Sequence, residues 1–212
     1  MNDIIGLFVA VLASLFSVVN PIGAVPVFLS MTANYTKAAR NKTVLYTSIY
    51  FTAILLVFFF AGTLILSFFG ISINAMRIAG GLVILSSGYG LLSSKFEDTR
   101  AISPEVTEEA LHKQDISFSP LAMPLLSGPG SISLLISLSA ERSQWLDKLV
   151  IAFVIVTIGL IVFMILRSAP YFNRVLGVAG MRALSRIMGF IVMAIAVQYI
   201  ISGVVDLVKS LV

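Results

Sequence analysis

Long apolar runs separated by short polar stretches dominate the pattern of residues along the chain. A helix needs about 20 residues to cross a hydrocarbon core of roughly 30 Å, and six runs reach or approach that length. They cover residues 4–31, 44–69, 75–92, 116–139, 149–166 and 187–205. We therefore predict an all-α membrane protein with six transmembrane helices, so that both termini lie on the same side of the membrane.

Composition narrows the class of protein further. Of the 212 residues, 58% are hydrophobic and 11% are charged, whereas water-soluble domains are about half apolar and a quarter charged. A water-soluble protein is thereby excluded. The lack of cysteine excludes disulfides, thiolate metal sites and cysteine nucleophiles. The net charge of +4 is small and its basic residues lie near segment ends, so we expect membrane lipid as a partner and no nucleic acid.

Basic residues are unequally distributed between the loops. Ten of the 14 Lys and Arg residues follow the first, third and fifth segments, and four lie elsewhere. Because Lys and Arg accumulate in cytoplasmic loops, both termini are predicted to lie outside the cytoplasm. The N-terminus lacks the positive region of a secretory signal, so we expect the first segment to be a retained span in a bacterial-type inner membrane.

Two pairs of similar motifs indicate an internal repeat. Arg77-Ile78-x-Gly80-x-x-Val83 opens the third segment, and Arg186-Ile187-x-Gly189-x-x-Val192 opens the sixth, 109 residues later. The first segment contains Asn20-Pro21-Ile22-Gly23, and the fourth contains Ser127-Gly128-Pro129-Gly130-Ser131. Pro21 and Pro129 differ by 108 residues, which is nearly the same offset. Pairing Pro21 with Pro124 instead gives an offset of 103, and this alternative stays open.

The repeat predicts a single membrane domain in three parts. Residues 1–94 form the first three-helix repeat, residues 95–115 an acidic cytoplasmic linker, and residues 116–212 the second repeat. Since three crossings are an odd number, the second repeat enters the membrane from the opposite face, and the repeat is inverted. Many secondary transporters have inverted repeats with paired discontinuous helices and a site between the halves near the midplane.

Proline near the middle of the first and fourth segments predicts a broken helix in each. Proline removes an amide donor and clashes with the preceding turn, and the freed groups are tolerated only inside protein or along a wet cavity. Amides that begin the next half-helix favour a carboxylate, and freed carbonyls suit an ammonium group. Alternatively, both kinks serve packing alone. The predicted substrate-binding residues are Asn20, Pro21, Gly23, Ser127, Gly128, Pro129, Gly130 and Ser131.

The same two motifs resemble the paired signatures of the MarC family. They read Asn20-Pro21-Ile22-Gly23-Ala24-Val25-Pro26 and Pro124-Leu125-Leu126-Ser127-Gly128-Pro129-Gly130. The resemblance covers the whole chain and implies a transporter of small neutral amino acids such as glycine and alanine. Alternating access would follow from the inverted repeat. The alternatives are an exporter of another small metabolite or drug, and a membrane scaffold with no solute of its own.

The remaining polar residues indicate no enzyme, because no catalytic motif occurs and His112 lies in the linker. No carboxylate lies in the middle of a segment, so coupling through a midplane acid is not expected. No cofactor is predicted; a coupling ion (sodium or proton) and a homo-oligomer are left open. Arg77 and Arg186 suit either a gate or interfacial anchors, with anchors favoured. Further cavity-lining candidates are Ser86, Ser87, Tyr89, Gln198 and Tyr199.

Overall fold

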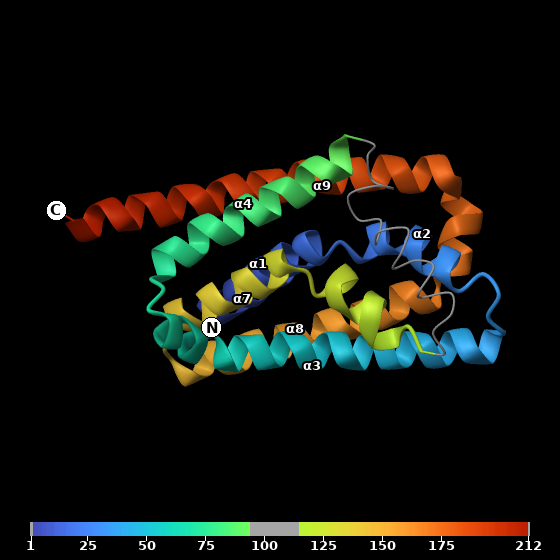
Figure 1. Cartoon of the computed structure of the whole chain (residues 1–212), viewed down its shortest axis with the longest axis horizontal. Helices are drawn as coiled ribbons and strands as arrows, with labels where there is room; N and C mark the ends of the chain where they lie inside the picture. The colour runs from blue at the N-terminus through green and yellow to red at the C-terminus, as the bar shows by residue number, and fades with distance from the viewer. Residues whose placement is uncertain (1, 94–114, 212) are drawn as a thin grey trace.

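The computed structural model describes residues 2–93 and 115–211 (Figure 1). This part of the chain is helical and contains no strand. The elements are α1 (Asn2–Val19), α2 (Pro21–Met31), α3 (Lys37–Phe69), α4 (Ile73–Leu92), η1 (Ser117–Leu126), α7 (Pro129–Glu141), α8 (Trp145–Arg167) and α9 (Ala169–Leu211). The expected all-α architecture is confirmed. Most of the predicted linker 95–115, including His112, lies outside the described residues.

The chain runs back and forth along one direction, so the molecule has two ends (Figure 1). The end that carries the C-terminus also holds the α3–α4 and α7–α8 turns; we call it the termini end. The α2–α3 turn and the α8–α9 junction lie at the opposite end. Five helical segments are long and apolar enough to span a membrane, and η1 with α7, bent by 68°, makes a sixth if counted as one span.

Local side-chain chemistry explains where several helices begin and end. The Thr36 hydroxyl accepts a hydrogen bond from the Ala39 amide (3.2 Å), and the Ser72 hydroxyl accepts one from the Ala75 amide (3.1 Å). These N-caps satisfy amides that have no partner inside the helix. Gly70 ends α3 in the left-handed conformation, with φ of 65°, which glycine adopts without strain. Polar caps therefore delimit α3 and α4.

The start of the last helix differs from the sequence-based expectation. The apolar pattern predicts the sixth span only from residue 187, but α9 is already helical from Ala169. Gly177 interrupts it with φ of 60° and ψ of −178°, a conformation almost restricted to glycine. The segment Ala179–Ser210 is the actual span candidate. The apolar pattern does not show where this segment begins, because its first turns contain the basic residues Arg182 and Arg186.

Helices α4 and α9 pack against each other with their backbones almost in contact. A Cβ atom added to Gly88 would lie 3.0 Å from the carbonyl oxygen of Gly189, and one added to Gly189 would lie 3.0 Å from that of Gly88. Further along, a Cβ on Gly203 would lie 3.0 Å from the Asn74 carbonyl oxygen. The two helices are antiparallel (Figure 1). In a membrane such close van der Waals packing over small residues drives helix association.

We expect Gly189→Ala to lower the free energy of unfolding by about 1–3 kcal/mol, because the added methyl would force two backbones apart. Equilibrium unfolding of the purified protein in mixed detergent micelles measures this. Gly6→Ala is the matched control, since nothing lies within 4 Å of a Cβ at that position. Equal stability of the two variants would contradict the packing described for α4 and α9.

Candidate functional site

The first expected break is present at Asn20, between α1 and α2. Asn20 has φ of 45° and ψ of 63°, the left-handed region that asparagine tolerates better than most residues. Its amide donates to the Phe16 carbonyl (2.9 Å), and its Oδ1 accepts from the Gly23 amide (3.2 Å). Pro21 is the first residue of α2, where a missing amide hydrogen costs nothing. The break is therefore built from one capping asparagine and one proline.

The second expected break lies between η1 and α7. The wide helical turn η1 has non-helical backbone at Ser119 and Met123. The Ser127 amide donates to the Ala122 carbonyl (2.8 Å), and α7 begins at Pro129 with Gly128 as its N-cap. Because glycine has no capping side chain, the amides at the start of α7 receive no side-chain cap.

Both breaks contain a buried polar atom without a partner. Asn20 and Ser127 are each 1% exposed. Asn20 Nδ2 and Ser127 Oγ make no hydrogen bond within the described part of the chain. A buried polar group left unpaired costs about 1–3 kcal/mol, and such groups are rare enough in native proteins to require an explanation. Arg40 Nε and Ser137 Oγ are also buried without a partner among the described residues, outside the breaks. The two atoms at the breaks, where a ligand site is expected, indicate such a site.

The two breaks lie close together in the interior. A Cβ atom added to Gly130 would lie 3.4 Å from Val18 Cγ1, two residues before Asn20, and 2.9 Å from Ile84 Cγ1. The end of α1, the middle of α4 and the start of α7 thus meet at one place. Ile84 is completely buried.

The eight predicted site residues are not equally placed. Six are buried: Asn20, Pro21, Gly23, Ser127, Gly130 and Ser131. Gly128 is half-buried and Pro129 is exposed, so the proline ring starts α7 without facing the interior. The Ser131 hydroxyl donates to the Gly128 carbonyl (2.9 Å). It can therefore accept a hydrogen bond from a ligand but cannot donate one.

A cavity of about 530 Å³ lies between α1, α7 and α9. Its walls are mostly apolar, and its polar lining residues are Ser14, Arg142, Gln198 and Tyr199. None of the eight predicted site residues lines it. Two of the five additional candidates, Gln198 and Tyr199, do line this cavity, whereas Ser86 and Tyr89 are exposed on α4.

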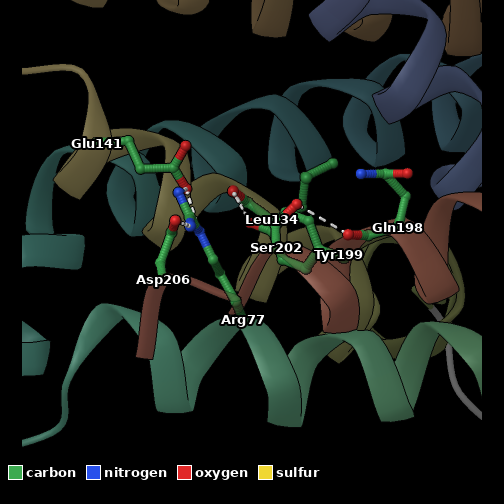
Figure 2. A network of polar contacts seen from close by, with 7 residues as sticks. All are labelled: Arg77, Leu134, Glu141, Gln198, Tyr199, Ser202 and Asp206. Atoms are coloured by element: carbon green, nitrogen blue, oxygen red, sulfur yellow. Dashed lines mark hydrogen bonds and ion pairs between the residues drawn. The ribbon is translucent and has the colours of Figure 1, made fainter. Parts of the chain in front are cut away.

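A cluster of charges at the termini end was not foreseen as a unit. The Arg77 guanidinium lies between two carboxylates, 2.7 Å from Glu141 and 2.5 Å from Asp206 (Figure 2). The pairs are separated by 64 and 129 positions in the sequence, so no local spacing could reveal them. Among the described residues no group of three or more His, Cys, Asp or Glu could hold a metal ion.

Comparison with known proteins identifies the family. A profile described as "MarC family integral membrane protein" matches residues 5–208. The chain belongs to the MarC family. The resemblance recognised in the two proline motifs is thereby confirmed.

Curated MarC relatives match over almost their whole length. A UPF0056 membrane protein of Buchnera aphidicola is 37% identical over 97% of this chain and 95% of its own. A UPF0056 membrane protein of Methanocaldococcus jannaschii is 40% identical over 93% of this chain and 95% of its own. The UPF0056 inner membrane protein MarC of Escherichia coli is 35% identical over 94% of both chains. No solved structure matches. These names and the apolar helices show an integral, multi-pass membrane protein of inner-membrane type.

We expect Asn20→Ala to destabilise the protein more than Asn20→Gly. Loss of the N-cap costs about 1 kcal/mol with alanine but only about a few tenths with glycine. Alanine must also adopt the left-handed conformation, at roughly 1–2 kcal/mol more. Unfolding in mixed micelles would measure the difference. Equal destabilisation would mean that the Asn20 backbone is free to rearrange.

Proposed function

We propose that this chain transports small neutral amino acids by alternating access, with the substrate bound where the two broken helices meet. The observation that carries the proposal is the pair of buried polar atoms without partners, Asn20 Nδ2 and Ser127 Oγ, one at each break. A polar solute would complete their hydrogen bonding. A kink that served packing alone would leave no reason for both groups to stay unpaired.

The packing supports an inverted repeat as the framework for this mechanism. Helix α4 of the first repeat packs on α9 of the second, and α3 packs on α8. The contact of α1 with α8 is equivalent to the contact of η1 with α3. Likewise, the contact of α2 with α9 is equivalent to the contact of α7 with α4. Exchanging the two repeats therefore exchanges equivalent contacts, as a two-fold axis in the membrane plane requires.

The helix starts support the register in which Pro21 matches Pro129. Each proline is the first residue of the half-helix after its break, whereas Pro26 and Pro124 lie inside α2 and η1. The alternative offset of 103 residues would pair a helix start with an interior position. We infer two repeats offset by about 108–109 residues, in which α2 and α7 are equivalent half-helices.

The chemistry of the breaks suits the carboxylate of an amino acid. The unpaired atom of Asn20 is the donor Nδ2, because Oδ1 already accepts a hydrogen bond from the Gly23 amide. It lies at the start of α2, where the helix dipole also favours negative charge. At the second break the start of α7 has no side-chain cap. Ser127 Oγ and carbonyl groups of the irregular backbone of η1 would accept hydrogen bonds from the ammonium group.

The restricted space favours a small side chain on the substrate. A Cβ atom at Gly23 would lie 2.5 Å from Asn20 Nδ2, and one at Gly130 would lie 2.9 Å from Ile84 Cγ1. The cavity between α1, α7 and α9 includes none of the site residues. Six of the eight proposed site residues are buried, so entry of substrate requires helix movement.

Loss of one hydrogen bond to the substrate should weaken transport without unfolding the protein. In counterflow of labelled glycine and alanine into proteoliposomes, we expect Ser127→Ala to raise the half-saturation concentration about tenfold, corresponding to roughly 1.4 kcal/mol. Imposed sodium and proton gradients would then identify the coupling ion.

Ser48→Ala is the matched control for this measurement. Ser48 is also buried, at 6% exposure, but its hydroxyl already donates to the Val44 carbonyl within α3, so it has no unpaired hydrogen-bonding group to offer a substrate. Its transport should stay close to that of the unaltered chain. Absence of glycine or alanine exchange by folded, unaltered protein would overturn the amino-acid assignment and leave a scaffold or another solute.

The proposed orientation can be tested because the chain has no cysteine. Ser143→Cys introduces an exposed thiol in the α7–α8 turn, and Asn34→Cys introduces one in the α2–α3 turn. With both termini outside the cytoplasm, a membrane-impermeant maleimide should label Ser143→Cys in intact cells. Asn34→Cys should react only after permeabilisation, and the reverse pattern would invert the topology.

A further inference from the structure

The charge cluster at the termini end joins elements from both halves of the chain. Arg77 lies in the second turn of α4, Glu141 is the last residue of α7, and Asp206 lies near the end of α9. In Figure 2 the guanidinium extends from α4 into the space between the two carboxylates. One side chain of the first half therefore connects two helices of the second half.

The geometry of the cluster is not that of a surface anchor. The Arg77 side chain is only 12% exposed, while those of Glu141 and Asp206 are 27% and 46% exposed. An arginine that served as an interfacial anchor would extend towards the headgroups. Arg77 instead donates to both acids through separate nitrogens, and such charge-assisted bonds are short and directional.

Helix α7 connects this cluster directly to the substrate site. It has 13 residues from Pro129 to Glu141, which makes it about 20 Å long at 1.5 Å per residue. Its first residue follows the second break, and its last residue is part of the cluster. Glu141 and the residue that follows the second break are thus the two ends of one short helix.

Between the second break and Glu141, α7 makes further contacts with α4 and α9. A Cβ atom added to Gly80 of α4 would lie 2.6 Å from the Ser133 Cβ atom, so the two helices are tightly packed. On the other flank the Tyr199 hydroxyl of α9 donates to the Leu134 carbonyl (3.3 Å). These contacts are short-range packing and one hydrogen bond. The strong, separable interaction is the ion cluster.

We propose that Arg77, Glu141 and Asp206 form an ionic latch that keeps the termini end closed. Released from Arg77, the end of α7 moves away from α4 and α9, and the substrate site opens to the termini side. The inference rests on the proposed transport function, to which it adds the gate on one face. The charged groups lie near water at the end of the spans, so each is hydrated when the latch opens and the process is reversible.

A buried reporter cysteine tests the latch directly. Ser137 lies on α7 one turn before Glu141 and is completely buried, and the chain contains no other cysteine. In Ser137→Cys, reaction with a membrane-impermeant methanethiosulfonate reagent should be slow. Adding Arg77→Gln should accelerate labelling at least tenfold, and only from the membrane side on which Ser143→Cys reacts.

A matched control distinguishes a latch from general loosening of the termini end. Asp147 pairs with Arg142 (3.6 Å) across the α7–α8 turn, at the same end but within one half of the chain. Asp147→Asn should leave the labelling of Ser137→Cys unchanged. Acceleration by Asp147→Asn as large as that by Arg77→Gln would overturn the proposal, as would an unchanged rate in Arg77→Gln.

A second variant covers the case in which Arg77→Gln does not fold. Asp206→Asn keeps the shape of the side chain and leaves Glu141 to neutralise Arg77, and it should accelerate labelling in the same direction. Because labelling does not depend on flux, the two proposals can fail separately. Accelerated labelling without amino-acid exchange supports the latch and rejects the substrate, whereas exchange with unchanged labelling rejects the latch.

Discussion

The cost of an unpaired peptide group in hydrocarbon governs this structure. Lipid offers no hydrogen bonds, so a broken helix is tolerated only where protein or water surrounds it. The chain interrupts two of its spans, at Asn20 and between η1 and α7, and the end of α1, the middle of α4 and the start of α7 meet beside these breaks. Surrounding helices must then approach closely, which α4 and α9 achieve through glycines that bring their backbones almost into contact. Irregular backbone at the centre and close packing around it are consequences of the same constraint.

The sequence was most informative where one residue type acts alone. Apolar runs of span length predicted the helices, and proline flanked by glycine and a polar residue predicted the breaks at Asn20 and Ser127. Both predictions depend on short-range chemistry, namely the missing amide of proline and the hydrophobic length of a span. Lipid leaves no alternative to burial of the freed backbone groups, and most residues at the breaks are buried, although Pro129 is exposed.

Features that depend on three-dimensional packing could not be read in this way. Arg77 was interpreted as an anchor because its partners, Glu141 and Asp206, are distant in the sequence. The beginning of α9 was missed because Arg182 and Arg186 resemble a polar loop, although the first turns of a span can carry such residues near a membrane surface. The cavity between α1, α7 and α9 combines residues of three segments. Each case requires knowing which helix faces share an interface.

The cap at Asn20 also determines the direction in which its side chain can act. With Oδ1 held by the Gly23 amide, the carboxamide cannot rotate by half a turn without breaking that bond, so its NH₂ group always faces the buried side. Aspartate could form the same cap but would bring a second acceptor and a negative charge to that face. Asparagine thus combines a backbone function with a fixed chemical polarity: at the first break the cap leaves a hydrogen-bond donor, and not an acceptor, without a partner among the described residues.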